Sequence, residues 1–541
     1  MVSSPPQYAA AALGAYAIWY LVRRFFVSTP LDNVPGPPSP SFLTGNLLEL
    51  HDPDGWEFHH QLETNYGQVV KLRGLLSAPH LYVFDPVALH SMLVQDYDYY
   101  EEHLTYLKVY GLLWGPGILS SVGQDHHRYR KILSPAFAPS RIREMIPMFY
   151  EVAEKARDGL VSPFVKDGPN ELDFNNILNR TSLELIGRTG IGYSFDAMIP
   201  GRPADDRYAV VLKELVPTVF KLGGLFPLLP FALKIGTPAF RRWVLDCIPW
   251  KPLREARDLV NYMDNIAMEL VSSKKAAVAR GQLEMSEESR DIMGVLLKGN
   301  LLAKPGDGTF LTDAELVAQT GMIISAATDT TSSALDRIFH LLALHPDIQE
   351  KLRAEVIEAP AQMDYEALGN LPYLDAFIHE VMRLYPPVTP VMFRECVKDA
   401  LLPLGTPITG VDGRQITAIP VPKGTILYIA IPAANHNPQI WGADALEFRP
   451  ERWENGRAGA RAEKMCGIYG NMMTFFAGER SCLGFQFSLL EIKVVMAVFL
   501  RAFTFSPGKA EVKWKLSGII AVPNVEGEVK LPISVASINH A

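Results

Sequence analysis

FFAGERSCLG, at residues 475–484, is a glycine-punctuated loop that delivers one cysteine, Cys482, to the start of the apolar segment 485–503. If that segment is a helix, its unpaired N–H groups and the positive end of its dipole stabilise a thiolate. Gly478 allows a backbone conformation closed to other residues, and Gly484 removes a side chain where a flat ligand would approach. These features predict that Cys482 is a metal ligand.

The same loop carries groups that suit a metal-bearing organic cofactor. Phe475 would keep water from the sulfur, and Arg480, two residues before the cysteine, can clamp a carboxylate. The alternative is that Cys482 is a buried apolar thiol in a helix-capping loop, because free cysteines are commonly buried. The other motifs of the chain decide between the two interpretations.

The pattern Phe-x-x-Gly-x-Arg-x-Cys-x-Gly resembles the haem-thiolate signature of the cytochrome P450 monooxygenases. The resemblance implies that Cys482 is the proximal ligand of the iron in haem b. It also implies that Arg480 binds a haem propionate, and that Phe475, Gly478 and Gly484 shape the cofactor loop. The implied fold is the cytochrome P450 fold, mainly α with a smaller β portion.

The chain has 541 residues, 48% hydrophobic and 20% charged, which is enough for a large core or several domains. No composition shift or long polar linker follows residue 40, so one large catalytic domain is predicted over residues 42–541. The net charge of -8 argues against a nucleic-acid partner, which needs a basic face. Four scattered cysteines are too few for a disulfide framework and favour a reducing compartment.

The N-terminus predicts a single-pass membrane anchor over residues 1–27. Residues 8–22 are apolar and uncharged, and a full span requires that Arg23 and Arg24, which follow, snorkel to the interface. A cleaved signal peptide would carry its basic residues before the apolar stretch. Basic residues after it keep the catalytic domain in the cytosol. The proline-rich hinge at 28–41 resembles that of microsomal family members, which implies the endoplasmic reticulum membrane.

Apolar periodicity predicts several elements of the catalytic domain. Residues 56–66 and 372–384 have the pattern of helices, and a further helix begins at Gly123. Residues 68–72 and 80–85 alternate and are rich in β-branched residues, which predicts a hairpin. The mixture agrees with a mainly helical fold that contains a smaller β part.

One long helix is predicted over residues 312–345. A capping box, Thr312-x-x-Glu315, opens this helix and Pro346 ends it. Its centre, residues 322–331, is apolar with small side chains and then abruptly polar. Such a change inside a buried helix needs a reason.

The polar change resembles the oxygen-activating stretch of the family. Small side chains such as Ala326 let a planar cofactor lie against the helix, and an acid beside a hydroxyl can relay protons. The resemblance implies that Asp329 is the catalytic acid and Thr330 the catalytic alcohol. The family usually has glycine where Ala327 stands, so the depth of the local helix distortion stays open.

Three more residues match the family's propionate partners. His126 and Arg130 lie four apart on one helix face, where the family has a tryptophan and an arginine. Imidazole can also donate to a carboxylate, so His126 keeps the role. The alternative is a solvated basic helix face. Arg394 ends the extended segment 386–394 and matches another propionate ligand.

Glu380 and Arg383 lie three apart on one helix face, and Arg452 stands in the downstream segment PERW at residues 450–453. The family joins such residues in a buried network. The resemblance therefore implies a structural role for these three residues, with two guanidinium groups around one carboxylate.

An uncharged substrate pocket is expected beside the oxygen-activating helix. Its predicted lining is Leu112, Leu113, Ile323, Val388, Met392, Ile519 and Ile520. This lining predicts an apolar, fairly bulky substrate, with terpenoid, sterol, fatty-acid and aromatic compounds all left open.

Residues 222–231 form another apolar stretch, which glycine and proline interrupt. It is too short to span a bilayer. A dip into the membrane and an interior loop are equally good interpretations, because an exposed apolar patch marks a membrane or a protein contact.

Together the motifs predict a fungal-like membrane-anchored monooxygenase that hydroxylates or epoxidises an apolar substrate with O2. No flavin or nicotinamide fingerprint is evident, so an NADPH-dependent cytochrome P450 reductase is the expected partner. A terpenoid-type secondary metabolite is the preferred substrate class. The alternatives are a haem-thiolate isomerase or dehydratase, and a non-catalytic haem carrier, neither of which needs Asp329 and Thr330.

Overall fold

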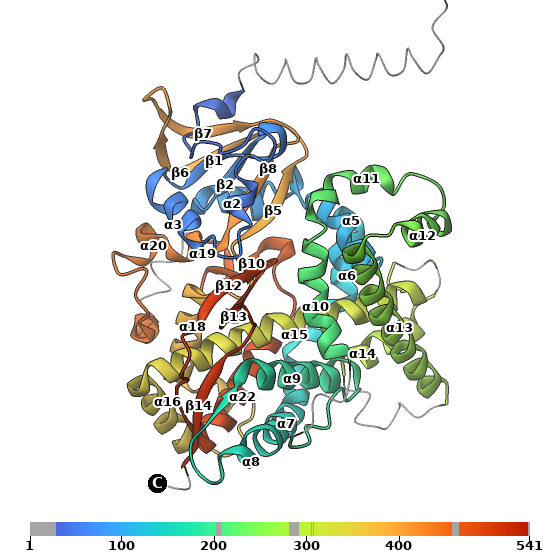
Figure 1. Ribbon diagram of the computed structural model, residues 1–541, viewed down its shortest axis with the longest axis vertical. Helices are drawn as coiled ribbons and strands as arrows, with labels where there is room; N and C mark the ends of the chain where they lie inside the picture. The colour runs from blue at the N-terminus through green and yellow to red at the C-terminus, as the bar shows by residue number, and fades with distance from the viewer. Residues whose placement is uncertain are drawn as a thin grey trace, which may run out of the picture.

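The computed structural model describes residues 29–201, 207–280, 291–304, 306, 308–456 and 465–538. Figure 1 shows a large helical part beside a smaller part that holds the largest sheet. The predicted fold class, mainly α with a smaller β portion, is confirmed. The predicted anchor over residues 1–27 lies outside the described residues.

The long helix α15 (Asp313–Leu344) runs through the centre of the helical part (Figure 1). Its predicted capping box is confirmed, because the Thr312 hydroxyl accepts from the Glu315 amide at 3.3 Å and the Glu315 carboxylate accepts from the Thr312 amide at 2.7 Å. The helix ends two residues before Pro346, as proline requires. Most of its side chains are buried, so a polar group along it needs a partner or a function.

The helices predicted at 56–66 and 372–384 are confirmed as α3 and α18, and the helix predicted to begin at Gly123 is α6. Besides α15, the α-helices of the described residues are α2 (Leu47–Leu50), α3 (Trp56–Asn65), α4 (Pro86–His90), α5 (Leu104–Leu113), α6 (Gly123–Leu133), α7 (Pro139–Ala156), α8 (Ser162–Val165), α9 (Phe174–Ile186), α10 (Tyr208–Phe220), α11 (Leu229–Ala232), α12 (Pro238–Cys247), α13 (Lys251–Ala279), α14 (Ile292–Leu302), α16 (Pro346–Glu358), α17 (Tyr365–Gly369), α18 (Pro372–Leu384), α19 (Ile431–His436), α20 (Pro438–Trp441) and α22 (Phe485–Ala502).

The largest sheet has the strand order β1-β2-β8-β5-β3. The predicted hairpin is confirmed, because β1 pairs with β2 antiparallel from Val69 opposite Val83 to Arg73 opposite Pro79. Smaller sheets join β11-β14-β4, β6-β7, β9-β10 and β12-β13. The strands are β1 (Val69–Arg73), β2 (Pro79–Val83), β3 (Tyr100–Glu101), β4 (Asn170–Asp173), β5 (Val391–Cys396), β6 (Ala400–Thr409), β7 (Gln415–Val421), β8 (Ile426–Ala430), β9 (Gly467–Tyr469), β10 (Met472–Ala477), β11 (Phe503–Pro507), β12 (Lys513–Ser517), β13 (Ile520–Asn524) and β14 (Pro532–Ser537).

The apolar stretch 222–231 forms η9 (Gly223–Leu228) and α11, and it lies at the surface. Leu228 is 60% exposed and Phe231 68%, which contradicts the interior-loop interpretation for these two residues, whereas Leu222 is buried and Phe226 and Leu229 pack against the core. Within the described ranges, no single helix has both the length and the apolar composition to cross a bilayer. Only α10 followed by 223–232, bent by 65°, passes that test as a pair.

The predicted Glu380–Arg383–Arg452 network forms in the core. Arg383 donates from Nε and Nη2 to the two carboxylate oxygens of Glu380 at 2.9 and 2.8 Å, and Arg452 Nε donates to the same carboxylate at 3.2 Å. The Trp453 indole adds a fourth donor at 2.9 Å. Burial raises the pKa of Glu380, but these donors outweigh it and hold the pKa below its usual value.

This network reaches the cysteine loop through one residue, Asn435. Arg383 Nη1 donates to the Asn435 carbonyl at 3.0 Å. The Asn435 side chain in turn accepts from the Met473 amide at 2.8 Å and donates to the Thr474 hydroxyl at 2.9 Å. Both residues lie on β10, the strand that leads into the loop of Cys482. The buried ion pair therefore fixes the backbone that presents the cysteine.

We expect Arg383→Leu to destabilise the protein by about 3–5 kcal/mol, because it leaves the fully buried Glu380 without its main partner. Urea unfolding followed by circular dichroism measures the change. Arg449→Gln is the matched control, because the Arg449 side chain is 51% exposed and an exposed ion pair contributes about 1 kcal/mol or less. Equal losses in the two variants would contradict the structural role of the network.

Candidate haem and oxygen-activation site

The cysteine loop has a backbone that only glycine can adopt at its turn. Gly478 has φ of +62°, and a Cβ there would lie 1.9 Å from the Leu93 carbonyl oxygen. Phe476 also lies in the left-handed region, with φ of +63°. A non-glycine residue in that region costs on the order of 1–3 kcal/mol, and such residues cluster at functional sites. The loop is closed by the Cys482 amide, which donates to the Phe475 carbonyl at 2.9 Å.

Cys482 itself is exposed, although it precedes the largely buried helix α22. Burial of the surrounding loop raises the pKa of its thiol, while the Gly484 amide and the charge of Arg130 lower it. A Cβ at Gly484 would meet no protein atom closer than Phe137 at 3.6 Å. The protein's own packing does not require this glycine, which leaves space beside the sulfur for a flat group.

Arg130 supports this loop from α6. Its two terminal nitrogens donate to the Ser481 carbonyl at 2.8 Å and to the Ser481 hydroxyl at 2.9 Å. Phe475 packs its ring against Phe485, with centroids 6.0 Å apart. Arg130, predicted to hold a propionate, therefore also fixes the residue next to Cys482, while each terminal nitrogen keeps a second N–H.

The other predicted propionate partners meet around a cavity of about 340 Å³. His126, Arg394 and Arg480 all line it, although they come from distant parts of the sequence. Arg394 Nη1 forms an ion pair with Glu102 at 2.7 Å, and Arg480 Nη2 donates to the Ser121 carbonyl at 2.7 Å.

Two of these groups have donors left for a bound acid. Arg394 Nη2 is buried and has no hydrogen-bond partner among the described residues. Burial and the neighbouring Arg480 charge lower the pKa of His126 to about 3, so its ring is neutral near pH 7 and can donate from one nitrogen. An unsatisfied arginine N–H beside a neutral imidazole fits a carboxylate. The residues present therefore fit a haem propionate.

The predicted acid and alcohol lie on α15 as expected. Burial raises the pKa of Asp329 to about 7, and the positive charge of Lys213 opposes the rise. The Thr330 hydroxyl donates to the Ala326 carbonyl at 2.7 Å, inside a helix that continues without a break. Ala326 is exposed while the preceding residue Ser325 is buried. This face of α15 is therefore open to a bound group.

The helix that follows Cys482 packs against this part of α15. Glu491 of α22 faces Thr331 of α15, and burial raises the pKa of Glu491 well above its usual value. Among the described residues, neither the Thr331 hydroxyl nor Oε1 of Glu491 has a hydrogen-bond partner. Thr331 is the residue after Thr330. The cysteine helix α22 therefore packs against the helix that carries Asp329 and Thr330.

The predicted substrate-pocket residues come together only in part. Val388 pairs with Ile520, and the Thr389 amide donates to the Ile519 carbonyl at 2.8 Å. Trp114, after Leu113, donates its indole N–H to Ser325 on α15 at 3.1 Å. The other predicted lining residues are Ile323, which is buried, Met392 and Leu113, which are partly buried, and Leu112, which is 50% exposed.

Two contributors to the site were not predicted from the sequence. Glu102 neutralises Arg394, and Lys213 acts on Asp329 from α10. Lys213 could have been noticed in the sequence, because it is a lysine within a largely apolar helix. In the structure it donates to Asn175 at 2.9 Å. Glu102 could not have been found in this way, because its partner Arg394 lies 292 positions away and no local sequence pattern indicates the pair.

Comparison with known proteins agrees with this geometry. The family model described as cytochrome P450 matches residues 35–531. The chain is 42% identical to cytochrome P450 monooxygenase 91 of Postia placenta over 535 residues, which cover 97% of each chain. It is 37% identical to ganoderic acid synthetase CYP5150L8 of Ganoderma lucidum over 522 residues, which cover 94% of each. With a family match over nearly its whole length, the chain belongs to the cytochrome P450 family and has its fold.

Proposed function

We propose that the protein inserts one atom of O2 into an apolar substrate at a haem b held by Cys482, with electrons from NADPH delivered by a separate cytochrome P450 reductase. The observation that carries this proposal is the exposed cysteine of a strained loop, followed by a helix, α22, that packs against α15, the helix of the acid–alcohol pair. Haem ligated by a thiolate supplies the oxygen-activating chemistry when it is bound.

The protein's own residues would hold the haem, shield it from water and supply protons. Cys482 would ligate the iron, and Arg394 with His126 would bind a propionate through donors that the protein leaves free. Asp329, with a pKa of about 7, can take up and release a proton near neutral pH. The Thr330 oxygen keeps lone pairs that can hold a water beside it.

We propose a terpenoid-type secondary metabolite as the substrate, hydroxylated or epoxidised. The predicted lining is uncharged, and a relative with 37% identity is named ganoderic acid synthetase. A fatty-acid, sterol or aromatic substrate is the alternative. A haem-thiolate isomerase or dehydratase would not need Asp329 and Thr330, and a haem carrier would not need them either.

Cys482→Ser should abolish thiolate ligation, because an alcohol stays protonated near neutral pH whereas a cysteine beside a metal does not. The measurement is the red-shifted Soret band of the reduced carbonyl complex. Cys247→Ser is the matched control, because that exposed thiol lies on α12 away from the loop. Survival of the band in Cys482→Ser would show that another residue ligates the iron.

Asp329→Asn and Thr330→Ala should keep haem binding but lower the product formed per NADPH consumed. A general acid–base contribution is typically on the order of a hundredfold, and water can replace part of a lost hydroxyl, so Thr330→Ala should cost less. NADPH, hydrogen peroxide and product are measured together. In wild type, product per NADPH should fall above about pH 7, as Asp329 loses its proton, and Asp329→Asn should remove that inflection. Unchanged coupling in both variants would revive the isomerase interpretation.

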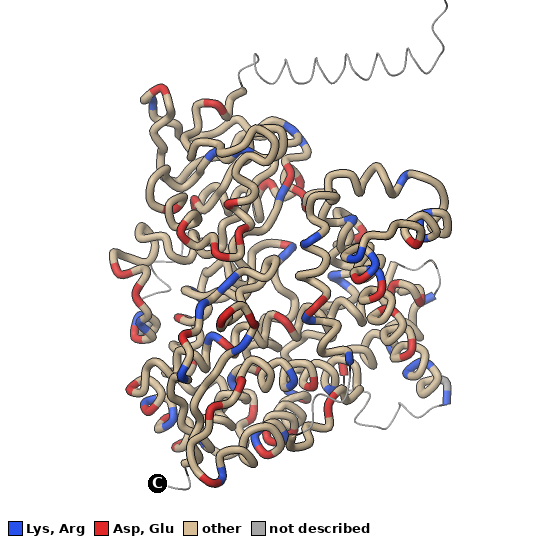
Figure 2. The backbone as a smooth tube through the Cα atoms, viewed as in Figure 1, with Lys and Arg blue, Asp and Glu red and all other residues tan. Residues whose placement is uncertain are grey.

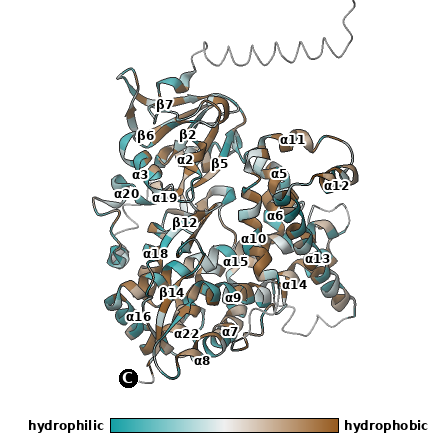
Figure 3. Ribbon diagram, in the orientation of Figure 1, coloured by the Kyte–Doolittle hydropathy of each residue, from teal (hydrophilic) through white to brown (hydrophobic). Residues whose placement is uncertain are grey.

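We also propose that the protein is held at the endoplasmic reticulum membrane, with residues 1–27 as a single-pass anchor and the catalytic domain in the cytosol. An exposed apolar surface, named here the α11 surface, supports a second lipid contact. It consists of Leu225, Leu228, Phe231, Ile235 and Trp243, each at least 42% exposed. Figure 3 shows hydrophobic colouring on α11, while Figure 2 shows Lys, Arg, Asp and Glu interspersed over the rest of the fold.

Removal of residues 1–27 should release only part of the protein from membranes, and adding Leu228→Ser with Phe231→Ser should release most of the rest. The readout is the fraction that sediments with phosphatidylcholine vesicles, with the carbonyl spectrum as a folding check. Leu302→Ser, also in the truncated chain, is the control, because Leu302 is 89% exposed and lies on α14. Equal sedimentation of the control and the double variant would exclude the α11 surface.

A further inference from the structure

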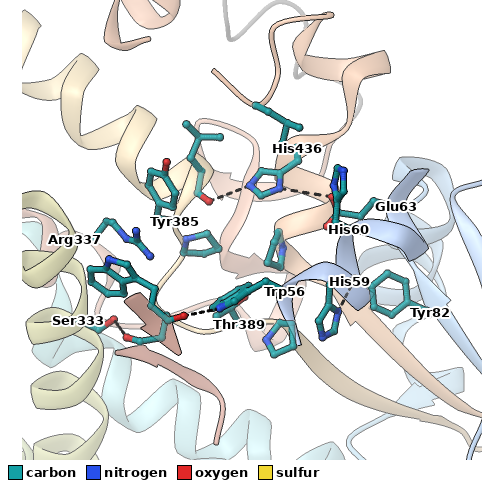
Figure 4. Close-up of a pocket in the computed structure, with 17 residues that line it drawn as sticks. Trp56, His59, His60, Glu63, Tyr82, Ser333, Arg337, Tyr385, Thr389 and His436 are labelled. Atoms are coloured by element: carbon teal, nitrogen blue, oxygen red, sulfur yellow. Dashed lines mark hydrogen bonds and ion pairs between the residues drawn. The ribbon is translucent and has the colours of Figure 1, made fainter. Parts of the chain in front are cut away.

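A cavity of about 390 Å³ lies outside the predicted site (Figure 4). It is bounded by α3, by the second half of α15, by the segment after α18 and by the β12–β13 hairpin. None of the seven predicted substrate-pocket residues lines it. Its volume falls within the range of small-molecule sites, roughly 300–1,000 Å³.

Arg337 of α15 is the cationic group of this cavity. Its guanidinium carbon lies 3.4 Å from the centroid of the Trp514 ring and 4.3 Å from that of Tyr385. Among the described residues, no carboxylate or carbonyl accepts from this guanidinium, and its Nε is fully buried without a partner. The nearby carboxylate of Asp336 accepts from Asn175 at 2.7 Å instead.

The rings of Trp514 and Tyr385 position the Arg337 guanidinium but cannot accept hydrogen bonds from its N–H groups. The cation–π contacts are attractive, yet the two rings offer no acceptor to the five N–H donors of the arginine. Burial lowers the pKa of Arg337 only to about 9, so the group stays charged near neutral pH. A carboxylate matches these donors in geometry and charge. The cavity therefore has a fixed cation that lacks its anion.

The rest of the lining defines the other features of the ligand. Most of the wall is apolar or aromatic, as in Trp56, Pro386 and Pro390. The Thr389 hydroxyl is buried without a partner and offers one more donor. At the far side, Glu63 lies 3.8 Å from His436, and its negative charge disfavours a second acid there (Figure 4). These features select an apolar molecule with a single acidic group.

We propose that this cavity binds an apolar monocarboxylic acid, with Arg337 anchoring its carboxylate. Thr330, Ser333 and Arg337 share one face of α15, and Arg337 lies about 10 Å beyond Thr330 at a rise of 1.5 Å per residue. Between them the Ser333 hydroxyl donates to the Ala521 carbonyl at 2.7 Å. The acid would thus occupy a site next to the oxygen-activating face and separate from it.

The test is calorimetric titration of the holoenzyme with 2-naphthoate and with the matched neutral probe 2-naphthamide. Imidazole is present at saturation, so that the haem iron is already ligated. Arg337→Gln should weaken 2-naphthoate binding roughly tenfold or more, as expected for hydrogen bonds to a charged group. Arg414→Gln, which removes an 87% exposed arginine, should leave the affinity unchanged. The amide should bind weakly and equally to wild type and Arg337→Gln.

Two further variants leave Arg337 in place in case its removal disturbs folding. Leu446→Trp narrows the cavity from a position that is 57% exposed, and Thr389→Val removes the unpartnered hydroxyl. Both should weaken 2-naphthoate binding while the carbonyl spectrum stays normal. Three outcomes would each overturn the proposal. These are failure of wild type to bind 2-naphthoate, loss of its binding when imidazole is added, and equal affinity of wild type, Arg337→Gln and Leu446→Trp for 2-naphthoate. None of these outcomes depends on monooxygenase activity.

Discussion

The buried carboxylate of Glu380 is the constraint on which the rest of the site depends. It takes donors from Arg383, Arg452, Trp453 and the Arg449 backbone, and it is fully buried. An ionised group in that position is tolerable only while its partners are complete. Asn435 connects this network to β10, the strand that leads into the cysteine loop. The need to pair Glu380 on α18 therefore also fixes the position of the Cys482 loop, about one hundred residues later in the chain.

The elements that could be predicted were those whose ends carry a local chemical signal. Thr312 and Glu315 define a helix start through their own hydrogen bonds, and Pro346 defines its end, so α15 was predicted to within a residue at each end. The glycine requirement at Gly478 follows from the loop motif itself, and its cause, the Leu93 carbonyl, needed the structure. Local rules therefore locate elements and turns well.

What could not be predicted was how each charged side chain would be used. Arg130 matches a propionate partner by position, and the structure adds that both its terminal nitrogens donate to Ser481. Ala327 left the helix distortion open, and α15 runs through without a break. The stretch 222–231 was equally compatible with burial, because an apolar sequence does not state which neighbours will cover it. The use of Arg130, for example, depends on Ser481, which is 351 positions away.

Three arginines in this fold differ in how fully the protein satisfies their N–H donors. Arg383 has all its donors occupied by the protein, so adding a ligand there would gain nothing. Arg394 has one occupied and one orphaned terminal nitrogen, which is the state expected of a side chain that shares its charge with a cofactor. Arg337 has aromatic neighbours but no acceptor among the described residues. Because a buried N–H without an acceptor costs free energy, the orphaned donors of Arg394 and Arg337 are the ones that support the proposed anionic ligands.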